Sequence, residues 1–186
     1  MDIEAIDLSV TSDLNGLSGH IPALDAAVTL VTTYGAVAIV AAVAIRWWWY
    51  GSAGKLRERY LAMLCGLSAA LGLLMNQAIL LVIHRIRPYD AGVTHALIPP
   101  SADPSFPSDH ATLAFAVAFA LLGVGANRGW GFLIAAIVLS TSRVYVGTHY
   151  ASDVLGGALT GLIAAIICLA LIRQESRFTQ LMARIF

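Results

Sequence analysis

Long apolar runs alternate with short polar connections along most of this 186-residue chain. The runs cover residues 26–49, 60–83, 109–125, 129–146 and 153–172. A helix needs roughly 17–25 apolar residues to cross the hydrocarbon core of a bilayer, and every run is close to that length. The pattern therefore predicts an all-α fold, a polytopic membrane helix bundle with about five transmembrane helices.

The composition excludes an ordinary soluble domain. Hydrophobic residues make up 59% of the chain and charged residues only 12%, whereas soluble domains average about 25% charged residues. The mean hydropathy is +0.79. We find no repeat, no low-complexity tract and no shift in composition, so residues 1–186 are expected to form a single integral-membrane domain.

The N-terminal segment, residues 1–23, mixes apolar and acidic residues. It begins Met1-Asp2-Ile3-Glu4 without a basic region, so it is not expected to be a cleaved signal peptide. A short helix at the membrane interface and a disordered tail both agree with this pattern.

The basic residues are distributed unevenly between the two sides that five spans would create. The positive-inside rule makes the side rich in lysine and arginine cytoplasmic. That side would hold Arg46, Lys55, Arg57, Arg59, Arg128, Arg173, Arg177 and Arg184. Arg85, Arg87, Arg143 and all five histidines fall on the other side, which is predicted to be extracytoplasmic.

A polar cluster between the last two apolar runs reads Ser142-Arg143, five residues, His149, three residues, Asp153. If a helix begins after His149, that histidine and Asp153 lie on one face as an i,i+4 pair. A carboxylate there can hold one ring nitrogen and leave the other free to attack. A chance group of interfacial polar residues is the alternative interpretation.

Two further polar clusters flank apolar runs. Arg87-Pro88 follows the run that ends near Ile83, and Pro107-Ser108-Asp109-His110 precedes the run that starts at Ala111. With these three clusters the sequence resembles the type 2 phosphatidic-acid phosphatase family of membrane-embedded phosphatases. The family's motifs end in Arg-Pro, contain Pro-Ser-x-His, and read Ser-Arg-x5-His-x3-Asp. The resemblance covers roughly residues 76–160.

The resemblance implies a catalytic role for three residues. His149 would be the nucleophile and form a phosphohistidine intermediate, with Asp153 holding its other ring nitrogen. His110 would protonate the leaving oxygen and then activate the water that hydrolyses the intermediate.

Other residues of the motifs are expected to bind the substrate phosphate. Arg87 and Arg143 can each clamp phosphate oxygens in a bidentate manner. Ser108, together with the amides of Ser108 and Asp109, stands at a predicted helix N-terminus, which favours an anion. No cofactor, metal ion or nucleic-acid partner is expected; the partners are the bilayer and a lipid phosphate.

One position departs from the family pattern. The lysine that usually lies seven residues before the motif arginine is replaced by Leu80. Arg85 either takes over part of that charge as a substrate-binding residue or contacts lipid head groups. The other motifs look most like the bacitracin-resistance branch, the undecaprenyl-pyrophosphate phosphatases, which can lack this lysine.

The resemblance thus implies hydrolysis of undecaprenyl pyrophosphate to the monophosphate at the outer face of a bacterial cytoplasmic membrane. Phosphatidate and phosphatidylglycerophosphate are alternative substrates within the family. A small transporter or channel is disfavoured because the charges gather at one interface rather than through the bilayer. The vanadium haloperoxidases share the motifs but are soluble, so the apolar runs argue against them.

Overall fold

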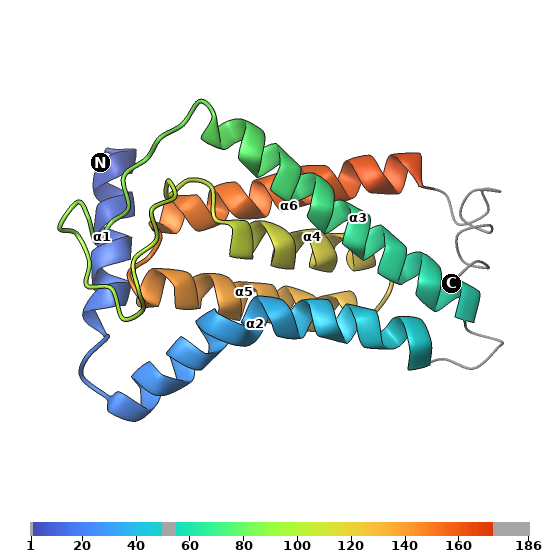
Figure 1. Ribbon diagram of the computed structural model, residues 1–186, viewed down its shortest axis with the longest axis horizontal. Helices are drawn as coiled ribbons and strands as arrows, with labels where there is room; N and C mark the ends of the chain where they lie inside the picture. The colour runs from blue at the N-terminus through green and yellow to red at the C-terminus, as the bar shows by residue number, and fades with distance from the viewer. Residues whose placement is uncertain (1, 50–54, 173–186) are drawn as a thin grey trace.

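The computed structural model describes residues 2–49 and 55–172, which form six helices and no strands. The helices are α1 (Ile3–Gly16), α2 (Pro22–Trp49), α3 (Lys55–Leu80), α4 (Asp109–Gly123), α5 (Gly129–Tyr145) and α6 (Ala151–Leu171). Helices α2 to α6 extend along the long axis of the molecule, and α1 lies across one end of this bundle (Figure 1). The all-α prediction is confirmed.

Three helices, α2, α3 and α6, are long and apolar enough to cross a membrane. The apolar helices α4 and α5 are shorter, with 15 and 17 residues. At about 1.5 Å per residue, 15 residues rise only about 22 Å, less than the roughly 30 Å of bilayer hydrocarbon. Of the five predicted spans, α2, α3 and α6 therefore have the length of a membrane span. Helices α4 and α5 are shorter members of the same bundle.

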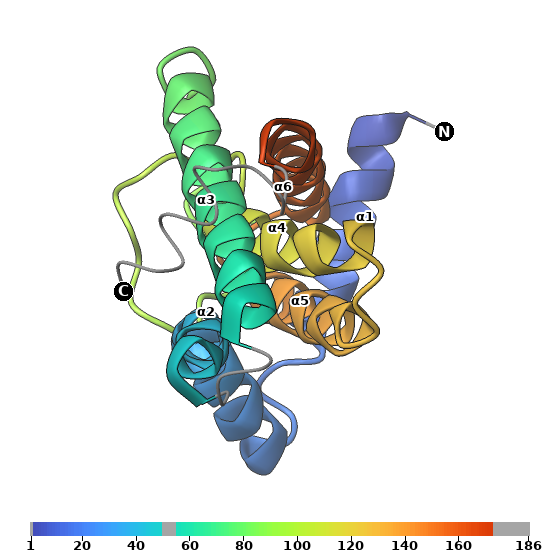
Figure 2. The ribbon, with the colours of Figure 1, turned by 90° about the vertical axis from the view of Figure 1, so that its right-hand side faces the viewer.

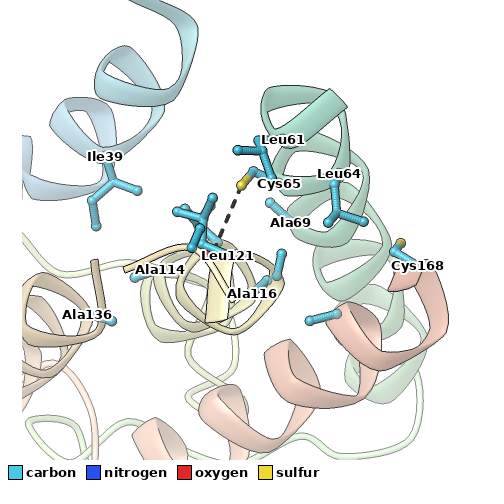
Figure 3. Packing of buried hydrophobic residues seen from close by; sticks show 14 of the residues in the cluster. Ile39, Leu61, Leu64, Cys65, Ala69, Ala114, Ala116, Leu121, Ala136 and Cys168 are labelled. Atoms are coloured by element: carbon cyan, nitrogen blue, oxygen red, sulfur yellow. Dashed lines mark hydrogen bonds between the residues drawn. The ribbon is translucent and has the colours of Figure 1, made fainter. Parts of the chain in front are cut away.

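Helix α4 occupies the centre of the bundle, between α3, α5 and α6 (Figure 2). Small buried residues, among them Ala114, Ala116 and Ala120, let the neighbouring helices approach closely. A Cβ atom at Gly161 of α6 would lie 2.7 Å from the carbonyl oxygen of Thr112. Leu61, Leu64 and Cys65 of α3 and Cys168 of α6 complete this apolar core (Figure 3).

The two ends of the bundle differ in their polar contacts. At one end the connection 81–108, the turn 146–150 and α1 lie together (Figure 1). At the other end, buried Glu58 pairs with Arg46 at 3.2 Å and with Arg128 at 2.6 Å. The predicted cytoplasmic residues Arg173, Arg177 and Arg184 lie outside the described residues.

Of the two conformations expected for the N-terminal segment, a helix and a disordered tail, the structure shows the helix. Asp2 caps α1, and its carboxylate accepts a hydrogen bond from the backbone N–H of Glu4 at 3.5 Å. Three polar residues are the buried positions of this helix: Asp7, Thr11 and Asn15. The helix therefore docks onto the bundle through polar contacts.

Candidate active site

A polar cavity of about 420 Å³ lies at the end of the bundle that carries the motifs. Its lining residues come from α3, α4, α5 and two connections: Gln77, Leu80, Arg87, Ser101, Asp103, Pro104, Pro107, Asp109, His110, Arg143 and His149. A larger groove of about 540 Å³, between α2 and α5, is lined by apolar side chains apart from Arg128 and offers little for chemistry. We therefore place the candidate active site in the polar cavity.

The turn that carries His149 depends on a glycine. Gly147 has a φ of +78°, a conformation that L side chains rarely adopt. A Cβ atom there would also collide with the carbonyl oxygen of His95. The conformation of the turn is consequently fixed by close backbone packing. His149 follows this glycine and lies in the cavity wall, with only 3% of its surface exposed.

The imidazole of His149 is oriented by a backbone carbonyl. Its Nδ1 lies 2.8 Å from the carbonyl oxygen of Ser105 and 3.5 Å from Oδ2 of Asp153. A carbonyl oxygen can only accept, so Nδ1 carries the proton and Nε2 keeps its lone pair. The carboxylate of Asp153 is within ion-pair distance of the same nitrogen, and the carbonyl of Ser105, which the motifs did not indicate, makes the shorter contact.

Burial also determines the charge of His149. Removal from water lowers the pKa of this histidine below its ordinary value, because the imidazolium form loses hydration. Asp153 opposes this shift, whereas the positive charges of Arg143 and Arg87 add to it. His149 is thus neutral at pH 7 and can act as a nucleophile.

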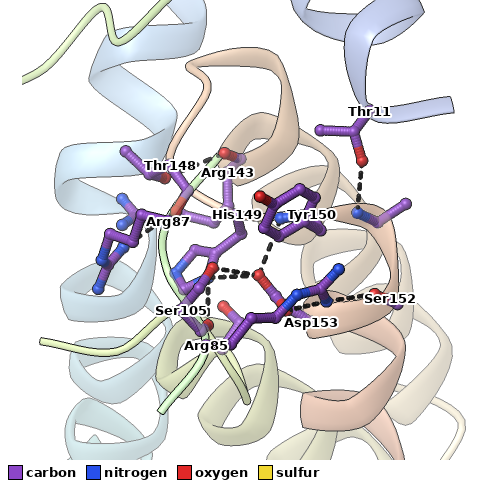
Figure 4. Close-up of polar contacts among 12 residues, drawn as sticks. Thr11, Arg85, Arg87, Ser105, Arg143, Thr148, His149, Tyr150, Ser152 and Asp153 are labelled. Carbon is purple, nitrogen blue, oxygen red and sulfur yellow. Dashed lines mark hydrogen bonds and ion pairs between the residues drawn. The ribbon is translucent and has the colours of Figure 1, made fainter. Parts of the chain in front are cut away.

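Asp153 is fully buried in the first turn of α6 and is surrounded by donors. Its Oδ2 accepts hydrogen bonds from the backbone N–H of Tyr150, at 2.8 Å, and from the hydroxyl of Ser105. Its Oδ1 accepts from Arg85 at 2.7 Å (Figure 4). With its oxygens bonded on both sides, the carboxylate is held in one orientation beside His149.

Two buried guanidinium groups line the cavity. Arg87 donates to the carbonyl oxygens of Asp103, at 2.8 Å, and Thr148, at 3.0 Å. Arg143 donates to Oγ1 of Thr32 at 3.0 Å, and its buried Nε has no partner among the described residues. Within the described part of the chain neither arginine pairs with a carboxylate. Two buried cations that have no carboxylate of the described residues within ion-pair distance favour an anion in this cavity, which Asp103 and Asp109 also line.

The start of α4 is arranged differently from what the sequence suggests. Ser108 is the N-cap, but its backbone N–H donates to the carbonyl oxygen of Asp153 at 3.1 Å. The expectation that this amide binds phosphate is therefore corrected, because the amide already has an acceptor. The hydroxyl of Ser108 is buried and has no partner among the described residues, and Ser108 itself is not among the residues that line the cavity.

The first two residues of α4, Asp109 and His110, both line the cavity. Oδ1 of Asp109 accepts a hydrogen bond from Asn76 of α3 at 2.7 Å, and the same amide donates to Thr112 at 2.9 Å. Asn76 thus ties α3 to α4, the interhelical role that suits a polar residue at membrane depth.

Arg85 is not placed where a substrate phosphate would need it. Its guanidinium forms ion pairs with Asp7 and Asp153, both at 2.7 Å, and it does not line the cavity. Leu80, at the end of α3, does line the cavity. The expectation that Arg85 replaces a cation at Leu80 is therefore corrected, since two carboxylates already hold it.

Sequence reasoning missed two residues of this site, Ser105 and Asp7. Ser105 stands at the start of the stretch Ser-Phe-Pro-Ser-Asp-His that ends at His110, and it bonds both His149 and Asp153. Asp7 lies 146 residues before Asp153, in a helix that the apolar pattern does not reveal. Asp7 is recognised as a site residue only from the fold, because its burial in a mostly exposed helix cannot be read from the sequence.

Comparisons with known proteins give the family of this chain. Residues 61–177 match the family described as the PAP2 superfamily. Undecaprenyl-diphosphatase BcrC of Bacillus subtilis (strain 168) is 34% identical over 93% of this chain and 88% of its own length.

Two solved structures share the fold. The crystal structure of Aquifex aeolicus LpxE has a TM-score of 0.72 at 25% identity and covers 91% of this chain and 99% of its own. The transmembrane PAP2-type phosphatidylglycerolphosphate phosphatase of Bacillus subtilis has a TM-score of 0.69 at 22% identity, covering 95% and 89%. Together with the apolar helices, these relatives confirm the membrane-bundle fold. This chain is an integral membrane protein that belongs to the PAP2 superfamily.

Proposed function

We propose that this protein hydrolyses undecaprenyl pyrophosphate to undecaprenyl phosphate and inorganic phosphate. The observation that carries the proposal is the pair of buried, carboxylate-free arginines, Arg87 and Arg143, in the cavity that His149 lines. Such a site suits a multiply charged phosphate group next to a neutral nucleophile. The similarity to BcrC, an undecaprenyl-diphosphatase, supports this choice of substrate.

In the first step, Nε2 of His149 attacks the terminal phosphorus. The bond between that phosphorus and the bridging oxygen breaks, and lipid monophosphate leaves. Arg87 and Arg143 stabilise the equatorial oxygens of the transferring group. Burial and the nearby cations lower the pKa of His110 in the free protein to about 4, so His110 takes up a proton when the negatively charged pyrophosphate binds and raises that pKa. It then donates this proton to the departing oxygen. The Nδ1 proton stays on the imidazole, where the carbonyl of Ser105 and the charge of Asp153 stabilise the positive ring.

In the second step, water releases the phosphoryl group from His149. His110, now lacking its proton, accepts one from the attacking water, and the phosphorus–nitrogen bond breaks to give inorganic phosphate. Nε2 regains its lone pair, and His110 regains its proton. The two arginines supply the positive charge for both steps.

We further propose that the cavity opens on the extracytoplasmic face of a bacterial cytoplasmic membrane. Among the described residues, Arg46, Arg128 and the basic start of α3 (Lys55, Arg57 and Arg59) lie at the opposite end of the bundle, which the positive-inside rule assigns to the cytoplasm. A substrate with its phosphates in water and its isoprenoid tail in lipid suits a cavity at the end of an apolar bundle.

A second candidate substrate is phosphatidylglycerophosphate, because a structural relative is a phosphatidylglycerolphosphate phosphatase. Purified protein in detergent should be supplied separately with undecaprenyl pyrophosphate, phosphatidylglycerophosphate and phosphatidate, and phosphate release measured. We expect the highest kcat/KM with undecaprenyl pyrophosphate. A preference for either glycerophospholipid would instead support that lipid as the substrate, and an absence of release from all three would reject the proposed activity.

A further inference from the structure

The short helix α1 turns one polar face toward the active site. Asp7, Thr11 and Asn15 follow one another at intervals of four residues, so they share one side of the helix. Each is 9% exposed or less, whereas most other residues of α1 are exposed. A helix that docks through three buried polar residues is held by specific hydrogen bonds rather than by apolar contact.

Two of these residues satisfy the start of α6. The first backbone N–H groups of any helix lack partners within it. Oγ1 of Thr11 accepts from the N–H of Ala151 at 3.0 Å, and Oδ1 of Asp7 accepts from the N–H of Ser152 at 2.8 Å. Ala151 and Ser152 directly follow the turn that carries His149. The hydrogen bonds from their amides to α1 therefore fix the position at which that turn ends.

Arg85 connects α1 to the carboxylate beside the nucleophile. Its Nη2 lies 2.7 Å from Asp7. Its Nη1 lies 2.7 Å from Asp153 and 2.6 Å from Oγ of Ser152 (Figure 4). The same guanidinium stacks over the ring of Tyr150, with 3.8 Å between Cζ and the ring centroid. Burial lowers the pKa of Arg85, but Asp7 and Asp153 outweigh it and raise the pKa above its ordinary value.

The two oxygens of Asp153 are thus used differently. Oδ1 is bound by Arg85, which turns Oδ2 toward Ser105 and leaves it 3.5 Å from His149. Without Arg85 the carboxylate would keep Tyr150 and Ser105 on Oδ2 but lose the guanidinium contact that holds Oδ1. Without Asp7, Arg85 would lose the carboxylate that holds its other side.

We propose that α1 acts as a clamp on the active site, with Asp7 and Arg85 as positioning residues that orient Asp153 and the turn bearing His149. The inference rests on the proposed role of His149 as the nucleophile. Arg85 does not touch substrate in this arrangement. The clamp acts on the rate of phosphoryl transfer and leaves the binding of the lipid unchanged.

The test compares Arg85→Gln and Asp7→Asn with the wild type, as purified full-length proteins in detergent. Because a small misplacement of a reacting group can cost about 10²-fold in rate, we expect kcat to fall about 10- to 100-fold, with KM changed less than about twofold. The double variant should lose little more than Arg85→Gln alone, since the two residues act as one unit. Arg85→Lys should recover part of the rate.

Asp13→Asn is the matched control, because Asp13 lies on the exposed side of the same helix; it should keep wild-type kcat. Asp7→Asn retains an oxygen that can accept the hydrogen bond from the amide of Ser152. The proposal can therefore be tested with this variant even if Arg85→Gln does not fold. The clamp is rejected if both single variants melt at a lower temperature but keep wild-type kcat. A rise in KM for pyrophosphate lipid alone would also reject it, because Arg85 would then bind substrate.

A His149→Asn variant assayed in parallel separates the two ideas. If it retains wild-type activity, the proposed function fails. If it is inactive while Asp7→Asn and Arg85→Gln keep wild-type kcat, only the clamp fails.

Discussion

The carbonyl oxygen of Ser105 lies 2.8 Å from Nδ1 of His149, and the two residues are 44 positions apart in the chain. This contact determines which ring nitrogen carries the proton, and it makes Nε2 the nitrogen with a lone pair. The hydroxyl of Ser105 bonds Asp153, the carboxylate closest to the same ring. Ser105, a single residue of the connection 81–108, thus orients both His149 and Asp153.

The pH dependence of kcat/KM should report on His149. Because burial lowers the pKa of this histidine, its neutral form persists below pH 6.5, and the acid limb should lie below that value. Asp153 raises the same pKa, so Asp153→Asn should move the limb to still lower pH and should also lower kcat. Both proteins are assayed with the same lipid, so ionisation of the substrate cancels. A limb displaced to higher pH in the variant would contradict this assignment.

Ser105→Ala keeps the backbone carbonyl but removes the hydroxyl donor to Asp153. A hydrogen bond to a charged group contributes about 1.5–3 kcal/mol, so we expect kcat to fall about tenfold or more. Ser68→Ala is the control, because Ser68 is also buried and its hydroxyl has no partner among the described residues. Equal effects of the two substitutions on kcat would show that the Ser105 hydroxyl does not support catalysis.

Gly157 lets α6 approach the start of α4. A Cβ atom there would lie 2.6 Å from the carbonyl oxygen of Ser108 and 2.9 Å from Cβ of Ala111. Gly157→Ala should therefore destabilise the protein by about 1–3 kcal/mol, as overpacking does, and should displace Ser108 and His110. Thermal unfolding and kcat are the measurements. Gly66→Ala, in α3 with no atom within 4 Å of the new Cβ, should keep kcat and unfold at the same or a slightly higher temperature, because alanine favours a helix more than glycine does. A neutral Gly157→Ala would refute the close contact.

The orientation in the membrane can be tested with single cysteines. Ser101 borders the cavity, and Asn127 lies in the turn between α4 and α5; both are exposed. In intact cells, Ser101→Cys should react with an impermeant thiol reagent, whereas Asn127→Cys should react only after the cells are opened. The native Cys65 and Cys168 are buried, so the wild type serves as the background. The opposite pattern of labelling would reverse the proposed topology.

The apolar pattern predicted the helices of the bundle to within about five residues at each end, because long apolar runs leave the chain few alternatives in a membrane. It could not decide between a helix and a disordered tail for residues 1–23. Helix α1 is held by tertiary hydrogen bonds from Asp7, Thr11 and Asn15, which a local pattern does not contain.

The motifs predicted five of the residues that line the cavity: Arg87, Asp109, His110, Arg143 and His149. They did not predict which group binds Nδ1 of His149. The spacing of four residues indicated Asp153, but a backbone carbonyl from a distant connection lies closer. For Arg85 the sequence left substrate and lipid head groups as alternative partners. Its partner Asp7 lies 78 residues earlier in the chain, in a contact that no local pattern contains.

The central claim, that His149 carries the phosphoryl group, is tested most directly by trapping that group on the enzyme. Wild-type protein is mixed with undecaprenyl pyrophosphate labelled with ³²P in the terminal phosphate and quenched in alkaline detergent within one turnover. We predict an acid-labile, base-stable label that maps to the peptide containing His149, is absent in His149→Asn, and accompanies a loss of turnover well beyond the ~10²–10⁴-fold typical of a lost general acid–base group. Label on a different residue, or turnover near wild type in His149→Asn, would contradict the mechanism.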